Sequence, residues 1–248
     1  MNERQTAILE LVRQKPGIKV GELAEHFDVS PMTIRRDLTD LASQGLLIRT
    51  HGGAIPPTPA PQSALAPHPT APKAAIGRLA ATLVQRGQTV MVDTGTTALE
   101  VARHLPADWN LTVATTSLSV AEALYPSSIQ VLVLGGLLKK GFPSLYGPLT
   151  ESNLAALHVD ILFIGCDGAD SEAGFYTADV HLSSVEQAMI RSAGRVVVVT
   201  ESSKFGRRAF ARYATPDQVD TVVTDSHLPA EDRLNLEERG VSVLIANT

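Results

Sequence analysis

The 248-residue sequence contains one cysteine, Cys166, and no hydrophobic run long enough to cross a membrane. A single cysteine excludes a disulfide framework and any zinc site built from several cysteines. The first residues are polar and lack the apolar core of a secretion signal, so we expect a cytoplasmic protein. The formal net charge of −5 argues at first against a nucleic-acid partner.

Motifs for nucleotide and metal chemistry are also missing. The sequence has neither a Gly-x-Gly-x-x-Gly loop for dinucleotides nor a Gly-x-x-x-x-Gly-Lys-Ser/Thr loop for nucleoside triphosphates. The seven histidines include no pair at the spacing of a helical zinc site. A lone buried cysteine is usually a small apolar filler, so we favour that interpretation of Cys166 over a redox role. We therefore expect no cofactor and no metal ion.

A proline-rich stretch divides the chain. Residues 56–72 hold seven of the 15 prolines, and such segments favour extended polyproline conformations. We interpret this stretch as a semi-rigid linker between a first domain, residues 1–55, and a second domain, residues 73–248. The alternative is an irregular loop packed on one domain.

Apolar residues at helical spacing predict three short helices before the linker. Ser30 is a good N-cap for the third helix, and Pro31 suits its first position because that amide would be unpaired anyway. A short apolar run at residues 46–49 is strand-like, and Gly52-Gly53 turns the chain. Two short helices, a tight turn and a following helix are typical of a helix-turn-helix.

The third predicted helix has its apolar residues on one face, so its polar residues point away from the core. Arginine can bind guanine O6 and N7 with two hydrogen bonds, and hydroxyl groups suit phosphates. The alternative is a protein-docking module whose arginines are merely solvated. The candidate DNA-binding residues are Ser30, Met32, Thr33, Arg35, Arg36, Arg49 and His51.

After the linker, apolar strand-like runs alternate with helical patterns, which predicts a mainly parallel sheet with helices on both faces. The expected strands are residues 89–93, 111–115, 129–134, 159–165, 195–200, 221–224 and 241–246. The expected helices are residues 98–104, 118–124, 182–193 and 230–239.

Loops suited to an anion follow several of these strands. Residues 93–97, Asp-Thr-Gly-Thr-Thr, lead from a strand into a helix whose first amides, assisted by hydroxyls, suit a phosphate. The alternative is an ordinary threonine N-cap. Residues 115–117, 135–136, 165–168 and 202–206 follow other strands. Ligands in open α/β sheets bind beyond the carboxyl ends of strands, where such loops gather.

Both halves of the chain resemble the DeoR-type (DeoR/GlpR family) bacterial transcriptional regulators. The first half matches at residues 29–38, 45–46 and 49–54, and the second at residues 93–97, 135–136, 147–148, 159–160, 167–168, 203–206 and 224–225. The resemblance implies a winged helix-turn-helix and a second domain with a fold similar to ribose-5-phosphate isomerases and CoA transferases. It also implies a phosphorylated sugar or related metabolite as effector, with no catalysis retained.

The strand-end loops and the resemblance together give a set of candidate effector-binding residues. They are Asp93, Gly95, Thr96, Thr97, Ser117, Gly136, Asp167 and Lys204. Three other residues depart from the family pattern. Thr116 stands where relatives usually carry asparagine, and Leu182 and Glu186 replace a common Glu-x-x-x-Lys pair. The phosphate loop is intact, but these departures are also compatible with an atypical ligand or a lost ligand response.

The sequence therefore predicts a transcriptional regulator that binds a double-stranded DNA operator as a homo-oligomer, dimer or tetramer. We expect a repressor of an operon for sugar or related carbon metabolism, without enzymatic activity. One alternative is a sugar-phosphate isomerase or transferase with a DNA-binding appendage, in which Asp93 and Asp167 are eligible bases. The other is a ligand-independent DNA-binding activator.

The net charge is compatible with this function once it is divided at the linker. Residues 1–56 hold seven basic and seven acidic side chains, so the whole excess of −5 belongs to the remainder. A neutral first domain with few arginines predicts weak non-specific DNA binding and a modest dependence on salt.

Overall fold

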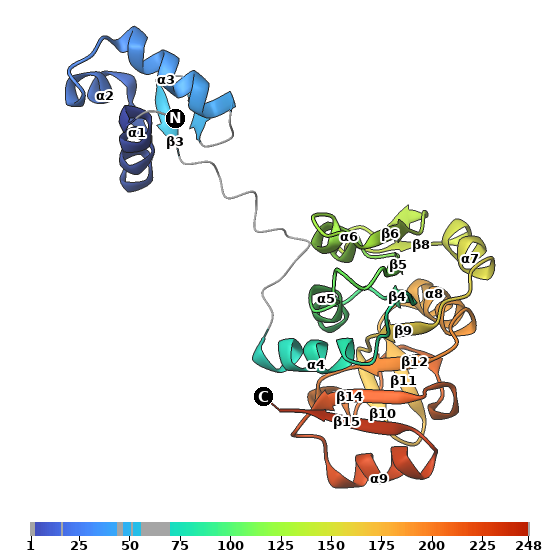
Figure 1. Cartoon of the computed structure of the whole chain (residues 1–248). Helices are drawn as coiled ribbons and strands as arrows, with labels where there is room; N and C mark the ends of the chain where they lie inside the picture. Colours follow the sequence, from blue (N-terminus) through green and yellow to red (C-terminus); the bar gives the residue numbers. More distant parts are fainter. Residues whose placement is uncertain (1–2, 16, 44–46, 51, 56–69, 248) are drawn as a thin grey trace. The chain divides into compact units, whose positions relative to one another are not determined.

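The computed structural model describes residues 3–15, 17–43, 47–50, 52–55 and 70–247. Contacts divide the chain into two compact units, within residues 1–64 and 65–248. Both units are drawn in Figure 1. No helix in the described ranges is long and apolar enough to cross a membrane.

The first unit is a winged helix-turn-helix. Its elements are α1 (Glu3–Gln14), β1 (Ile18–Lys19), α2 (Val20–His26), α3 (Pro31–Ser43), β2 (Ile48–Arg49) and β3 (Gly53–Ile55). The strands form an antiparallel sheet in the order β1-β3-β2. Pro31 begins α3 and the Thr33 amide donates to Ser30 Oγ at 3.2 Å, as expected of an N-cap.

A small apolar core holds the three helices together, and a partly buried ion pair joins α1 to α3. Ile8 of α1, Leu23 of α2 and Ile34 of α3 are fully buried in the same cluster. Asp37 of α3 is also buried, and its Oδ2 accepts a hydrogen bond from Arg4 Nε of α1 at 2.7 Å. This pairing fixes α1 against the inner side of α3 and leaves the outer side of α3 free.

The second unit is built on a seven-stranded parallel sheet in the order β15-β14-β12-β9-β4-β5-β6. All seven strands expected from the sequence form it. Their bounds are β4 (Thr89–Val92), β5 (Thr112–Thr115), β6 (Gln130–Val133), β9 (Ile161–Ile164), β12 (Val196–Val199), β14 (Thr221–Asp225) and β15 (Ser242–Ala246). The predicted fold class, a winged helix-turn-helix followed by a mainly parallel α/β domain, is confirmed.

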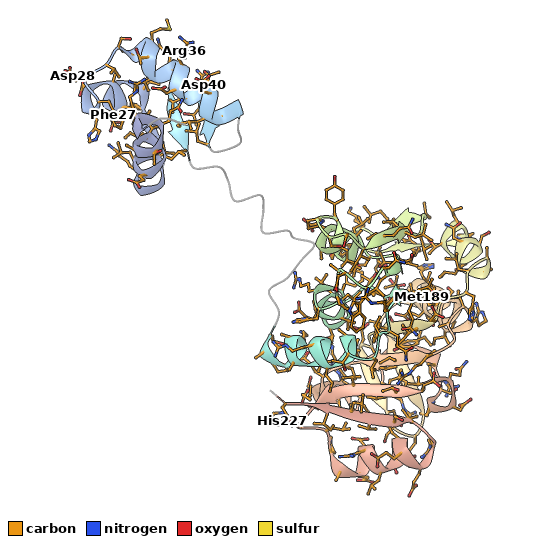
Figure 2. The ribbon with its side chains drawn as sticks, viewed as in Figure 1. Phe27, Asp28, Arg36, Asp40, Met189 and His227 are labelled. Carbon is orange, nitrogen blue, oxygen red and sulfur yellow. The ribbon has the colours of Figure 1, made fainter. Side chains whose placement is uncertain are left out.

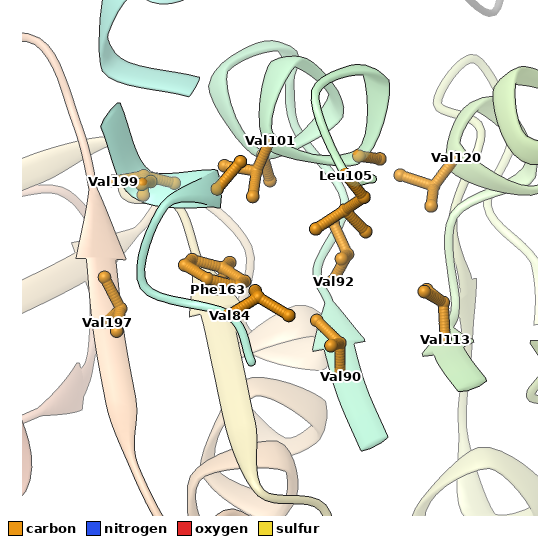
Figure 3. Close-up of a cluster of buried hydrophobic side chains, with 14 of the residues drawn as sticks. Val84, Val90, Val92, Val101, Leu105, Val113, Val120, Phe163, Val197 and Val199 are labelled. Carbon is orange, nitrogen blue, oxygen red and sulfur yellow. The ribbon is translucent and has the colours of Figure 1, made fainter. Parts of the chain in front are cut away.

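Helices cover both faces of this sheet. They are α4 (Ala71–Ala81), α5 (Thr96–Arg103), α6 (Leu118–Leu124), α7 (Pro148–Ala155), α8 (Val180–Arg191) and α9 (Ala230–Glu238). Side chains alternate along each strand between two apolar clusters. Val90 and Phe163 pack with α4, α5 and α6 (Figure 3), whereas Met91 and Leu162 pack in a second cluster with α7, α8 and α9.

Besides helices α4 and α7, two groups of strands in the second unit were not expected from the sequence. One is a small antiparallel sheet of β10 (Gly168–Asp170), β11 (Gly174–Thr177) and β13 (Ala211–Ala214). The other is the hairpin of β7 (Leu137–Leu138) and β8 (Leu145–Tyr146). These short strands contain no run of buried β-branched residues of the kind that marks the parallel sheet.

Helix α4 begins at Ala71, inside the stretch that composition assigns to the linker. Thr70 occupies its N-cap position, and Pro72 lies in its first turn. Proline is tolerated there because the first amides of a helix have no intrahelical acceptor. Pro72 therefore starts the helix rather than extending the linker.

Candidate functional site

The outer side of α3 forms the candidate DNA-binding surface. Arg35 and Arg36 are both exposed, and Met32 is 68% exposed beside them. Figure 2 shows Arg36 projecting from α3. This is the helix that enters the major groove in helix-turn-helix proteins, with its first residues at the base edges.

Two hydroxyl groups mark the start of α3. Ser30 Oγ accepts the Thr33 amide at 3.2 Å and lies 2.9 Å from Thr33 Oγ1. Both residues therefore fix the beginning of the helix, and their oxygens stay at the surface. Hydroxyls and helix N-terminal amides in such a position suit a DNA phosphate.

The second of the three β-strands brings an arginine to the same helix. Arg49 Nη1 donates to Thr39 Oγ1 at 2.8 Å, and Thr39 Oγ1 donates to the Arg35 carbonyl at 2.7 Å. Thr39, which the sequence analysis did not select, thus positions Arg49 beside Arg35. Its place one turn after Arg35 on the outward face is the signal that could have identified it. The remaining candidate, His51, lies outside the described residues.

The second unit has a cavity of about 210 Å³ at the carboxyl ends of β4, β9 and β12. From β4 the sheet continues with β5 and β6 on one side, whereas β9 and the later strands lie on the other side. The strand order therefore reverses between β4 and β9, and open α/β sheets bind ligands at such a switch point. A cavity of this size suits a small metabolite rather than a dinucleotide. Six candidate residues line it, namely Asp93, Gly95, Thr96, Thr97, Asp167 and Lys204.

The loop after β4 gives this cavity a wall whose groups suit an anion. Gly95 has φ +146°, a conformation that side chains disfavour, and it serves as N-cap of α5. The first amides of α5 have no intrahelical acceptors and carry the positive end of the helix dipole. Thr96 and Thr97 add hydroxyl groups to the same wall.

Lys204 adds a cation to the cavity. It ends a short 3₁₀ turn, η1 (Ser202–Lys204), and makes no ion pair with any residue that the structure describes. Asp225, at the end of β14, accepts hydrogen bonds from the Ser202 amide at 2.8 Å and from Ser202 Oγ at 2.7 Å. Burial alone would raise the pKa of Asp225, but these hydrogen bonds and that from His227 hold it below its ordinary value. Asp225 therefore positions the turn that carries Lys204.

The hydroxyl group of Thr94 links two further segments that line the cavity. Thr94 Oγ1 donates to Ser144 Oγ at 3.0 Å and lies 3.3 Å from Thr116 Oγ1. Ser144 comes from the loop between β7 and β8, so the unexpected hairpin closes part of the cavity. Thr116, one of the departures from the family pattern, is thus a cavity residue with a hydroxyl partner.

Acidic side chains line the cavity as well. Burial raises the pKa of Asp93 to about 7, against hydrogen bonds from the amides of Thr94 and Gly165. Burial and the neighbouring charge of Asp93 raise the pKa of Glu186 to about 9. Glu186 and Leu182 reach the cavity from α8, so all three departures from the family pattern lie at this site.

Ser117 and Gly136 are not among the residues that line the cavity. Ser117 is buried and caps α6, where its Oγ accepts the Val120 amide at 3.3 Å. Gly136 lies where β7, β8 and α7 approach, and a Cβ there would be 2.0 Å from Thr150 Oγ1. The close approach of Thr150 is by itself a reason for a glycine at this position.

We expect Gly136→Ala to destabilise the second unit by about 1–3 kcal/mol, because an added Cβ overpacks the contact with Thr150. The matched control is Gly135→Ala, whose added Cβ would have its nearest neighbour, Leu149 Cδ2, at 3.7 Å. Thermal unfolding of both variants measures the difference. Equal unfolding midpoints for the two would contradict this assignment.

Cys166 also lines the cavity, where its Sγ donates to Thr200 Oγ1 at 3.2 Å. Burial raises the pKa of this thiol to about 12, so it stays protonated at neutral pH. A protonated thiol is a weak nucleophile. The raised pKa therefore argues against a redox role for Cys166, although its hydrogen bond to Thr200 shows that its surroundings are not purely apolar.

An exposed recognition helix in one unit and a metabolite-sized cavity in the other define a ligand-responsive transcriptional regulator. Comparison with known proteins gives the family. Residues 4–60 match the DeoR-like helix-turn-helix domain, and residues 69–226 match the DeoR C terminal sensor domain. The chain therefore belongs to the DeoR family of transcriptional regulators.

Relatives of known description are similar over nearly the whole chain. The HTH-type transcriptional regulator GlpR of Haloferax volcanii is 35% identical, covering 98% of this chain and 96% of its own. The glycerol-3-phosphate regulon repressor of Escherichia coli is 35% identical, covering 92% of each chain. Among solved structures, ribose 5-phosphate isomerase A of Methanocaldococcus jannaschii aligns with a TM-score of 0.40 and 19% identity, over 54% of this chain and 53% of its own.

Proposed function

We propose that this protein represses an operon for sugar or related carbon metabolism, and that a phosphorylated sugar in the second unit controls its affinity for DNA. The observation that carries the proposal is the cavity at the carboxyl ends of β4, β9 and β12. It combines helix amides, threonine hydroxyls and Lys204, which together suit a phosphate. One relative is named as a repressor of the glycerol-3-phosphate regulon, and a regulon named for a phosphorylated metabolite is in keeping with a phosphorylated ligand.

DNA is the target of the first unit in this proposal. Arg35 and Arg36 read base edges, Ser30 and Thr33 bind phosphates, and Arg49 contacts the backbone from beside α3. A target on DNA agrees with a cytoplasmic location. The effector must bind the DNA-free form more tightly than the DNA-bound form, because only differential affinity shifts such an equilibrium.

The repressor acts as a homo-oligomer in this proposal, since one short recognition helix contacts few bases. The support is an apolar surface along one edge of the second unit. Strand β6 is an edge strand of the sheet, and such edges with exposed apolar side chains readily pair with another chain. The large exposed side chains on β6, β7 and α7 are Leu132, Val133, Leu137, Leu138 and Leu149.

Lys204→Ala is expected to retain operator binding but to require about 10- to 100-fold more effector for release from DNA. The reason is that the variant loses one hydrogen bond to the charged phosphate of the effector. A thermal-shift screen of sugar phosphates identifies the effector, and gel shifts with that compound measure release. The control is Lys140→Ala, which removes an exposed lysine that does not line the cavity.

Release of DNA by Lys204→Ala at the wild-type effector concentration would contradict the role of Lys204. Recovery of the effector unchanged after incubation with the protein supports sensing without catalysis. Turnover of the effector would instead favour the isomerase or transferase alternative, with Asp93 or Asp167 as the base.

A further inference from the structure

One buried carboxyl oxygen in the cavity has no partner. Glu186 is 7% exposed, and its Oε2 makes no hydrogen bond with any residue that the structure describes. The side chain lines the cavity from α8, and Thr177 supplies a hydrogen bond to its carboxyl group. An unpaired buried carboxyl oxygen is costly, so a ligand that fills this cavity would gain by donating to it.

The charges around Glu186 determine which kind of donor fits. Asp93 and Asp167 line the same cavity, and the negative charge of each raises the pKa of Glu186. We call these three residues the acidic cluster. Among other nearby groups, Asp179 is neutralised by an ion pair with Lys139. Without a ligand, Glu186 therefore avoids repulsion from Asp93 and Asp167 by staying protonated, and none of the surrounding ion pairs among the described residues supplies a cation that would let it ionise.

The two lysines of the cavity do not balance this cluster. Lys73 Nζ lies 3.3 Å from Glu201 Oε2, so its charge is used within that pair. Lys204 remains available, and the proposed function assigns it to the phosphate of the effector. A phosphate bound to Lys204 would then offset the positive charge of this lysine, which could otherwise attract the carboxyl groups.

A neutral hydroxyl group would satisfy one oxygen of Glu186 but would not offset the repulsion that arises when Glu186 ionises beside Asp93 and Asp167. An ammonium group supplies three donors and a positive charge, so it satisfies the oxygen and relieves the repulsion together. A metal ion is a poorer fit, because the described residues contain no group of three carboxylate, histidine or cysteine side chains placed to hold one.

We propose that the effector is a phosphorylated amino sugar, whose ammonium group binds the unpaired oxygen of Glu186, with the charges of Asp93 and Asp167 adding to the attraction. This inference rests on the proposed function and adds the class of substituent that the cavity selects. Lys204 and the start of α5 bind the phosphate, and the acidic cluster distinguishes an amine from a hydroxyl group on the sugar.

The test compares sugar phosphates that differ in one substituent. Calorimetric titration of the full-length protein uses glucosamine 6-phosphate against glucose 6-phosphate, and galactosamine 6-phosphate against galactose 6-phosphate. We expect the amino member of at least one pair to bind 10-fold or more tightly than its hydroxy partner, on the order of one charge-assisted hydrogen bond. N-acetylation, which removes the charge, should abolish the preference.

Glu186→Gln should reduce the ratio of amino to hydroxy affinity toward one, whereas Lys204→Ala should weaken both members of a pair equally. Glutamine is isosteric with glutamate, and unfolding midpoints without ligand verify that the variant is folded. Glu151→Gln, on α7 away from the cavity, is the matched control and should keep the wild-type ratio.

Equal affinity for the two members of each pair, or a preference that survives in Glu186→Gln, would overturn this inference and leave the proposed function standing. Failure of every sugar phosphate and of inorganic phosphate to bind would overturn the proposed function, and the inference with it.

Discussion

Replacement of both Arg35 and Arg36 by alanine is expected to lower operator affinity by about 1–3 kcal/mol for each arginine that reads a base. The two side chains are exposed at the start of α3, where a recognition helix meets the major groove. Because neither is buried, the free energy of unfolding should change by no more than about 0.5 kcal/mol. Gel shifts with the operator, and thermal unfolding of the same variant, measure the two quantities.

Single variants distinguish the roles of the arginines. An arginine that reads a base should lose affinity for the operator but keep affinity for unrelated DNA. An arginine that binds a phosphate should lose both, with the salt slope falling by about one. Arg191→Ala, at the exposed end of α8, is the control in the second unit. Wild-type affinity in both Arg35→Ala and Arg36→Ala would rule out this assignment.

Without ligand, the second unit is expected to lose stability as the pH rises from about 5 to about 9. Burial, and then the charge of Asp93, raises the pKa of Glu186 in the folded protein to about 9, above its ordinary value of 4.5. The protonated carboxyl group is therefore preferred in the folded state. Its contribution is fully present below the unfolded pKa and is lost as the pH rises toward the folded one, on the order of a few kcal/mol.

Thermal unfolding across this pH range tests the expectation. Glu186→Gln carries no titrating proton and should unfold at a midpoint that depends less on pH. It should also be more stable than the wild type at the alkaline end. Glu151→Gln should follow the wild-type curve. Identical pH dependence in Glu186→Gln and wild type would show that Glu186 is not held protonated by its surroundings.

The two units were predictable from the sequence to different degrees. The helix-turn-helix was predictable because its signals are local, such as the Ser30-Pro31 start of α3 and the spacing of Ile34 and Leu38. The seven strands of the parallel sheet were predictable because buried β-branched runs stand out between helices. The strands of the small sheet and of the β7–β8 hairpin contain no such run of β-branched residues.

The residues of the candidate site were also predictable from the sequence to different degrees. The loop after β4 and the Lys204 turn were found as motifs, because each is a short segment with its own chemistry. Glu186 was noticed only as a departure from the family pattern. Its contribution to the cavity depends on α8 packing beside β9 and β11, and no residue spacing within α8 predicts that contact. Ser144 and Asp225 act through partners 50 and 23 residues away in the chain.

The sequence by itself determined the order of the two domains, the family, the recognition helix and the glycine-threonine loop after β4. Only the tertiary structure decided which strand-end loops share a cavity, and that Ser117 and Gly136 do not line it. The tertiary structure also decided that Glu186 has a buried oxygen without a hydrogen-bond partner among the described residues. The reason is physical: helix periods and loop motifs arise from neighbouring residues, whereas burial and charge coupling arise from segments that are distant in the chain.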